Sequence, residues 1–424
     1  MFDLDLIKSK VHEHLIKKTD FLKVKERLSE EQMRQYVDRA ISDVCFEQQI
    51  EFPLERRLAL IRELVSAGIS LGPIRPLMED NTISEIMING YDSVYIQRDG
   101  RISLTDVKFD SPNHLLHTIQ KLLAASGSSR RVDESSPYVD FSLSDGSRVN
   151  VVLPPCSLVG AVVTVRKFAS DIATIDDLIK RHTLDKCMAT LLIAGMKAKL
   201  NVVFCGPTGT GKTTALNVLS RYLPEDERII TIEDTAELRL LQKHVVKLQY
   251  KPANIEGKGA ISIRELFVNS LRMRPDRIII GEVRGHEMLD LIQSISSGHS
   301  GSLAIVHADS PGDCFDRMVT MMLMTGIRLN TAEIKRLVAK AIDLVVHIEL
   351  HQDGVRRIMY ITDLYYDEEK QKDCMEHVFQ FEEKGFTQDS HIIGEWSMNK
   401  RKPSFYKKFE KRHVKLPEGF FESI

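Results

Sequence analysis

Residues 201–219 read NVVFCGPTGTGKTTALNVL, and the architecture of the chain can be worked out from them. An apolar run, a glycine-rich turn and a helical pattern follow one another, which is the context that a P-loop requires. With strand and helix both in place, a chance glycine-rich turn is disfavoured. The loop consists of Gly206, Pro207, Thr208, Gly209, Thr210, Gly211, Lys212 and Thr213, followed by Thr214.

A P-loop of this composition predicts a site for ATP and Mg²⁺. Its glycines let backbone N–H groups converge on phosphate oxygens, and the start of the following helix adds partial positive charge. Lys212 is expected to reach the β- and γ-phosphates, and the Thr213 hydroxyl is expected to bind Mg²⁺.

The chain from about residue 170 alternates apolar, β-branched runs with helical segments. This rhythm predicts an α/β domain in which helices cover a largely parallel sheet. Two later runs, VRRIMYITDLYYD and CMEHVFQFE, predict antiparallel strands. The expected parallel strands are LNVVFCG, RIITIED, HVVKLQY, RIIIGEV, SLAIVHA and AIDLVVHIEL.

Acidic residues stand at the ends of two of these runs. RIITIED ends on Glu233 and Asp234, and RIIIGEV carries Glu282. The carboxyl ends of parallel strands share one edge of a sheet, so these acids are expected near the P-loop. There they can hold Mg²⁺ through water or accept a proton from an attacking water. An ion pair with Arg284 is the competing interpretation of Glu282; the alignment of several acids favours the catalytic one.

Two histidines follow, His299 between glycines and His307 at the end of an apolar run. Metal binding is disfavoured because no third ligand stands at a suitable spacing. A histidine that contacts the γ-phosphate region is the preferred hypothesis. For His299 a purely structural role in a turn is an equal alternative.

The 424 residues exceed what one hydrophobic core supports, and the patterns predict three segments. Residues 1–70 read as helical, and 71–168 as an α+β domain with hairpin signals at Asp99-Gly100 and Asp145-Gly146. Residues 169–424 form the P-loop domain with a basic, aromatic tail. The net charge of -2 argues against a protein-wide positive potential that would attract nucleic acid.

Targeting and cysteine signals are also informative. The six cysteines include no CxxC pair, which argues against a disulfide framework or a zinc ribbon. The first residues lack the apolar core of a signal peptide, and no run is long and apolar enough to span a bilayer. These observations predict a protein of the reducing cytoplasm.

Four blocks in this order resemble the secretion ATPase superfamily, which includes the ATPases of type II secretion, type IV pili and type IV secretion. They are the P-loop, TIEDTAEL, MRPDRIIIGEVRG and SGHSGSLAIVHADSPGD. Upstream, three stretches resemble the CpaF group, the motor ATPases of tight-adherence or Flp pili. These are SEIMINGYDSVYIQRDGRI, VDESSPYVDFSLSDGSRVNVVLPP and TVRKF, and the resemblance extends from about residue 70 to 350.

The resemblance implies a RecA-like P-loop core, an N-terminal α+β domain that contributes to the nucleotide site, and a helical N-terminal extension. It makes Glu282 the catalytic carboxylate of a Walker B motif. Glu233 and Asp234 match the Asp box that places Mg²⁺ and water, and His307 matches the histidine of the His box. The family forms hexamers, so a homohexamer is expected.

Arginines of the N-terminal domain are implied to reach the γ-phosphate. Arg148 in DGSRVN and Arg166 in TVRKF are the best matches, and Arg130 and Arg131 are weaker ones. Positive charge placed where phosphoryl oxygens gain charge acts as an arginine finger. The alternative for each arginine is a surface or ion-pair role.

The implied activity is ATP hydrolysis that powers assembly or retraction of a pilus or a related secretion system. Its partner would be a polytopic inner-membrane platform protein, with residues 1–70 as a docking module and the ATPase held at the inner face of the membrane. The four-cysteine zinc module common in type II secretion ATPases is absent, which argues against that branch.

Three alternatives remain. One is a type IV secretion ATPase. Another is a nucleic-acid-dependent RecA-like motor, in which the tail KRKPSFYKKFEKRHVK would grip single strands. A solvated surface or a patch facing anionic lipid is the preferred interpretation of that tail, and no specific nucleic acid is expected. The third, a nucleotide-gated scaffold without turnover, is disfavoured by the intact Lys212, Thr213 and Glu282.

Overall fold

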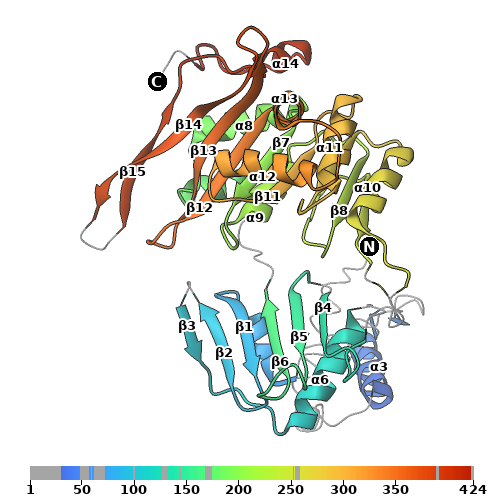
Figure 1. Ribbon diagram of the computed structural model, residues 1–424. Helices are drawn as coiled ribbons and strands as arrows, with labels where there is room; N and C mark the ends of the chain where they lie inside the picture. The colour runs from blue at the N-terminus through green and yellow to red at the C-terminus, as the bar shows by residue number, and fades with distance from the viewer. Residues whose placement is uncertain are drawn as a thin grey trace. The chain divides into compact units, whose positions relative to one another are not determined.

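The computed structural model describes residues 30–47, 57–58, 60–61, 72–98, 101–126, 131–143, 145–167, 174–251, 253, 258–387 and 391–421. The chain divides into two compact units, Met1–Ala169 and Ser170–Ile424. Each unit has its own sheet, as Figure 1 shows for the labelled elements. Buried hydrophobic residues form separate cores in the two units.

The first unit is built on a six-stranded sheet in the order β3-β2-β1-β6-β5-β4, and every neighbouring pair is antiparallel. Alternate residues of each inner strand are buried, as the period of two predicts. Leu115, Ile119 and Leu122 of α6 (Pro112–Ala125) pack on the buried face. The strands are β1 Ile83–Asn89, β2 Val94–Arg98, β3 Arg101–Leu104, β4 Tyr138–Ser142, β5 Arg148–Val152 and β6 Val162–Arg166.

Both predicted hairpins of this unit are present as antiparallel strand pairs, although Asp99 and Gly100 themselves lie outside the described residues. Helix α3 (Glu30–Glu47) confirms the helical prediction over its own span, and η1 (Gly72–Ile74) and α5 (Arg75–Glu79) follow. Most of residues 1–70 lie outside the described part, so their role as a separate module stays a prediction.

The second unit holds a nine-stranded sheet in the order β15-β14-β13-β12-β7-β11-β10-β8-β9. All six predicted parallel strands form and pair in parallel, and the two later runs form antiparallel strands. The strands are β7 Val202–Gly206, β8 Ile229–Glu233, β9 Val245–Gln249, β10 Arg277–Ile280, β11 Leu303–His307, β12 Leu344–Leu350, β13 Arg356–Asp367, β14 Lys372–Phe386 and β15 Ile392–Met398.

Helices cover both faces of this sheet, because the strands are apolar on both sides. Val202 and Phe204 of β7 belong to the core under α8 and α9, whereas Val203 and Cys205 face the core under α10 to α13. This confirms an α/β fold with a RecA-like core and an N-terminal domain. The helices are α7 Ile175–Lys180, α8 Lys186–Lys197, α9 Lys212–Ser220, α10 Ile263–Ser270, η2 Leu271–Met273, α11 Glu287–Ser296, α12 Pro311–Leu323, α13 Thr331–Ala341 and α14 Tyr406–Lys411.

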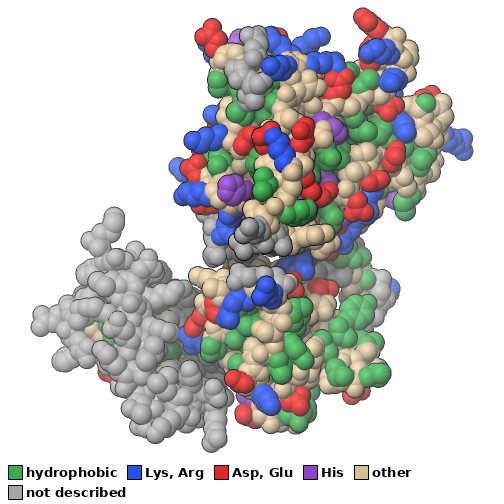
Figure 2. All heavy atoms as spheres, turned by 90° about the vertical axis from the view of Figure 1, so that its left-hand side faces the viewer, with side chains coloured by type: hydrophobic (Ala, Val, Ile, Leu, Met, Phe, Trp, Pro, Cys, Tyr) green, Lys and Arg blue, Asp and Glu red, His purple; other side chains and the backbone are tan. Residues whose placement is uncertain are grey.

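The basic tail is folded around its aromatic residues. Phe405, Phe409 and Phe421 are buried in the core that also contains α8 and α9, and α14 carries the intervening lysines. The suggestion that these aromatics stack on bases is wrong for the buried rings, because a ring inside the core has no face for a nucleotide. Acidic and basic side chains are intermixed on the face shown in Figure 2.

Candidate functional site

The P-loop connects β7 to α9 with the geometry that its glycines allow. Gly206, Gly209 and Gly211 have φ angles of 150°, 80° and 92°, values that residues with a Cβ rarely adopt. A methyl group on Gly206 would lie 2.1 Å from the carbonyl oxygen of Ile348. Gly211 is the N-cap of α9, so the loop amides gather at the positive end of that helix.

Lys212 is the buried cation of the loop. Its Nζ donates to the carbonyl oxygens of Gly206 (2.9 Å) and Pro207 (2.6 Å), and it lies 3.4 Å from Nδ1 of His307. Burial lowers the pKa of Lys212 to about 8, against the opposing charges of Glu282, Cys205 and Glu237. An anion beside this ammonium group would favour its charged form, so the site is suited to phosphate.

A chain of contacts links Lys212 to Glu282. His307 Nε2 lies 3.2 Å from Oε1 of Glu282. Burial, followed by the nearby Lys212 charge, lowers the pKa of His307, so this imidazole is neutral at pH 7. An ammonium group only donates and a carboxylate only accepts, which places the histidine proton on Nε2.

Glu282 follows β10 by two residues and so lies just beyond the strand end at which it was expected. Arg284 Nε and an Arg284 terminal nitrogen donate to its two carboxylate oxygens at 2.6 and 2.7 Å. Burial would raise the pKa of Glu282, but the Arg284 hydrogen bond and the charges of Arg284 and Lys212 hold that pKa below its usual value. The expected ion pair with Arg284 and the proximity to the P-loop lysine therefore both exist.

The two acids at the carboxyl end of β8 have different surroundings. Glu233 is buried, and its Oε2 accepts hydrogen bonds from the backbone N–H groups of Glu237 (2.7 Å) and Leu238 (2.9 Å). Burial raises the pKa of Glu233 to about 7, although the two amide bonds oppose the shift. Asp234 is half-buried, with Oδ2 3.6 Å from an Arg284 nitrogen. Glu233 holds the turn, and Asp234 shares Arg284 with Glu282.

The two histidines singled out in the sequence lie at opposite edges of the sheet. His307 is the last residue of β11, whose carboxyl end lies beside Gly206. His299 precedes β11 and therefore lies at the opposite edge of the sheet, with its backbone N–H bonded to the Ser294 carbonyl. The γ-phosphate hypothesis for His299 is wrong, and the structural alternative holds.

The predicted arginines belong to the first unit. Arg148 and Arg166 are directly opposed on β5 and β6, so their side chains share one face of the sheet. Arg166 Nε also donates to Oε1 of Glu85 at 2.7 Å. Arg131 is exposed, and Arg130 lies outside the described residues. The structure thus brings Arg148 and Arg166 together, while their action on a nucleotide stays a prediction.

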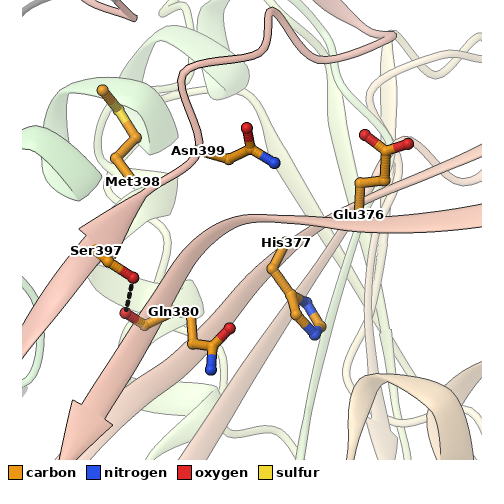
Figure 3. A pocket seen from close by; sticks show the side chains of 6 residues that line it. All are labelled: Glu376, His377, Gln380, Ser397, Met398 and Asn399. Atoms are coloured by element: carbon orange, nitrogen blue, oxygen red, sulfur yellow. Dashed lines mark hydrogen bonds between the residues drawn. The ribbon is translucent and has the colours of Figure 1, made fainter.

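A cavity of about 370 Å³ lies elsewhere, on the β14–β15 hairpin. Figure 3 shows Gln380 and Ser397 joined by a hydrogen bond at its wall, with His377 and Glu376 on the same strand as Gln380. In the strand order, β12 and β13 separate this hairpin from β7. The cavity is therefore not the site of the P-loop chemistry.

Two side chains at this edge of the sheet carry oxygen atoms that could bind a divalent cation. Thr213 is the second residue of α9, and Asp234 follows β8, whose carboxyl end lies at the same edge of the sheet as the P-loop. Hydroxyl and carboxylate oxygens are the ligands that Mg²⁺ accepts, so these side chains fit that ion. The sequence pointed to Arg284 only as a possible ion-pair partner of Glu282. The GEVRG motif places Arg284 two residues from Glu282, but its proximity to Asp234 is visible only in the structure.

Known proteins that resemble this chain belong to secretion and conjugal-transfer systems. The profile of the family described as "Type II/IV secretion system protein" matches residues 69–380. Rv3659c of Mycobacterium tuberculosis (strain H37Rv), named for conjugal transfer, is 32% identical over 313 residues, covering 72% of this chain and 88% of the relative. VirB11 of Agrobacterium fabrum is 29% identical over 315 residues, covering 67% of this chain and 90% of the relative.

A solved structure is similar as well. The crystal structure of the VirB11 ATPase of Brucella suis is 28% identical, covers 74% of this chain and 98% of its own, and gives a TM-score of 0.38. The family profile spans both units of the chain, from the start of the first sheet to β14. The chain therefore belongs to the Type II/IV secretion system protein family.

Proposed function

We propose that the chain is a Mg²⁺-dependent ATPase that acts as a homohexamer and powers assembly or retraction of a tight-adherence or type IV-like pilus, as in the CpaF group. The observation that carries the proposal is the contact chain from Lys212 through neutral His307 to ionised Glu282. It joins the phosphate-binding cation to a carboxylate that can take a proton from water.

In this mechanism Lys212 exchanges its two loop carbonyls for β- and γ-phosphate oxygens. The loop amides and the start of α9 hold the remaining phosphate charge. Glu282 accepts the proton of the attacking water, and His307 senses the occupied site through Lys212. Thr213 and Asp234 would hold Mg²⁺, with Glu233 acting through water and through its turn. When bound, the metal ion neutralises charge on the phosphate oxygens.

Lys212 predicts a pH dependence of nucleotide affinity. Its pKa of about 8 lies below the ordinary lysine value, so the nucleotide-free protein loses this charge as the pH rises above 8. Phosphate binding favours the charged form, so Kd for ADP should rise by up to about tenfold per pH unit between about pH 8 and 9.5. Fluorescence titration with mant-ADP measures this. A Kd that stays constant over that range would contradict the assignment.

The first unit is proposed to supply Arg148 and Arg166 to the γ-phosphate. Arg148→Ala should lower kcat by about a hundredfold or more and affect nucleotide affinity less, because an arginine finger acts mainly in the transition state. The matched control is Arg101→Ala, an exposed arginine on edge strand β3 of the same sheet. Steady-state kinetics equal to those of the wild type would remove Arg148 from the site.

Residues 1–70 are proposed to dock on a polytopic platform protein, which would hold the ATPase at the inner face of the cell membrane. Over the part of the chain that the structure describes, no helix is both long and apolar enough to cross a bilayer. Domain motion about the segment between residues 167 and 174 would transmit the work to that partner.

Type IV secretion is the second candidate, because the relatives include a protein named for conjugal transfer and VirB11. Introducing Lys212→Ala in the native host separates the two. Loss of surface pili supports the pilus motor, whereas intact pili with lost export of protein or DNA favour type IV secretion.

A nucleic-acid motor would give a different result in vitro. Its ATP hydrolysis would be stimulated by single-stranded DNA or RNA, and the stimulation would fall steeply with salt. We expect no such stimulation, because the tail aromatics that could stack on bases are largely buried.

A further inference from the structure

The flank of the P-loop opposite to Glu282 carries an arginine that makes direct contact with the loop. Arg356 begins β13, and its Nε donates to the carbonyl oxygen of Gly209 at 3.0 Å. Its stem lies against the start of α9, since a methyl group on Gly211 would be 3.2 Å from Arg356 Cδ. A guanidinium group therefore sits on the two loop glycines that shape the phosphate cradle.

Arg356 differs from its neighbour Arg357 in its pairing. Arg357 is buried and makes two hydrogen bonds, of 3.0 and 2.7 Å, to the carboxylate of Asp353. Within the described residues, no carboxylate lies at ion-pair distance from Arg356. Its Nε bond uses one of five N–H donors, so the others are available to an anion. Asp353 is thus committed to Arg357, while Arg356 has no carboxylate partner among the described residues.

A second cation, Arg181, belongs to a segment that is bonded to the same strand. Arg181 is the C-cap of α7, and the turn that follows is tied to β13 by a hydrogen bond of 2.8 Å from Ile358 N–H to the Thr183 carbonyl. Burial, with the added charge of Arg181, lowers the pKa of Arg356. Like charges in the same region beside a phosphate loop repel each other, and an anion bound there would relieve the repulsion.

The strand order separates this pair from the hydrolytic residues. β12 and β13 lie on one side of β7, whereas β11 and β10, which carry His307 and lead to Glu282, lie on the other. The pair is therefore placed to bind the nucleotide from the flank away from the attacking water.

We propose that Arg356 and Arg181 form a second cationic contact for the phosphate chain of the bound nucleotide, on the β12–β13 flank of the P-loop, and that this contact sets nucleotide affinity. The inference rests on the proposed ATPase function. Arg356 would keep its stem on Gly211 and turn its terminal N–H groups to phosphate oxygens, which a planar guanidinium binds in bidentate fashion.

The test measures two constants in the full-length wild type and three variants. They are Kd for mant-ADP and the inhibition constant of inorganic tripolyphosphate, which competes with mant-ADP. Arg356→Gln keeps an amide donor that can reach the Gly209 carbonyl but removes the charge. Together with Arg356→Ala it should raise both constants by at least about tenfold, and Arg181→Ala should raise them by about threefold or more. KM should change more than kcat.

The matched control is Lys197→Ala, which removes an exposed charge near the end of α8, at the opposite edge of the sheet. It should leave both constants unchanged. Arg181→Ala should also raise the melting temperature of the nucleotide-free protein slightly, because it removes a like-charge repulsion. If Arg181 only packed against its neighbours, its removal would not both raise the melting temperature and weaken phosphate binding.

Several results would overturn the inference. If Arg356→Ala weakens binding but Arg356→Gln and Arg181→Ala do not, Arg356 only holds the Gly209 carbonyl. If all variants bind as the wild type does, the pair makes no contact. If ADP affinity falls while tripolyphosphate affinity is unchanged, the contact is not to phosphate. A wild type that binds no nucleotide would instead refute the proposed function itself.

Discussion

Replacing Glu282 with glutamine will lower the rate of ATP hydrolysis by at least about a hundredfold while ATP remains bound, because the amide cannot accept the proton of the attacking water. Glutamine keeps the size of the side chain, so the loss reports on chemistry rather than packing. Single-turnover release of phosphate measures the rate, and equilibrium binding of ATP measures retention of the nucleotide.

Two controls separate this role from the ion pair with Arg284. Arg284→Ala breaks the pair but leaves the carboxylate, so it should cost less than about tenfold if Glu282 acts as the base. Glu225→Gln changes an exposed acid before β8, at the other edge of the sheet, and should have no effect. Equal losses in Glu282→Gln and Arg284→Ala would mean that Glu282 serves only the ion pair.

Arg277→Ala will destabilise the second unit by about 3–5 kcal/mol, because it leaves a buried carboxylate without its main partner. The Arg277 side chain is 0% exposed and that of Glu227 is 7% exposed. Arg277 Nε donates to Glu227 at 2.7 Å, and its terminal nitrogens donate to the carbonyls of Gly301 (2.7 Å) and Met196 (3.1 Å). Among the described residues, only Lys199, 3.2 Å from the same carboxylate, would remain as a cation.

The single tryptophan, Trp396, provides the probe. It lies on β15, and its indole N–H donates to the Ile358 carbonyl of β13 at 2.7 Å, so its fluorescence follows the second unit. Urea unfolding followed by this signal gives the free energy of unfolding. Arg264→Ala is the control, since Arg264 makes a more exposed 2.7 Å pair with Asp290 and should cost less than about 1 kcal/mol. Equal costs in the two variants would contradict the buried-pair argument.

Local patterns accounted for most of the fold. The parallel strands are continuous apolar runs, and a P-loop stands between a strand and a helix. Each of these elements could therefore be predicted from neighbouring residues. Strand β15 was missed because none of its residues is buried, which leaves little hydrophobic signal. The tail aromatics were misjudged because a sequence does not show that Phe405 and Phe409 turn inward.

The site was predictable where a strand end defines it and not where distant segments meet. His307 closes an apolar run, so its place at a strand end could be predicted. His299 in SGHSG belongs to no such run, so its sequence did not indicate at which edge of the sheet it lies. The partnership of Arg277 with Glu227 joins residues fifty positions apart, and no local pattern encodes it. Arg356 and Arg357 are adjacent in sequence, yet one contacts the P-loop and the other pairs with Asp353, because alternate residues of a strand face opposite sides.

The most direct test of the account is the rate of ATP turnover per protomer as a function of protein concentration, with Glu282→Gln as the blank. The account predicts turnover above the blank that rises with concentration and then saturates as rings form, with sizing at each concentration to follow assembly. Turnover that never exceeds the Glu282→Gln blank at any concentration would contradict it.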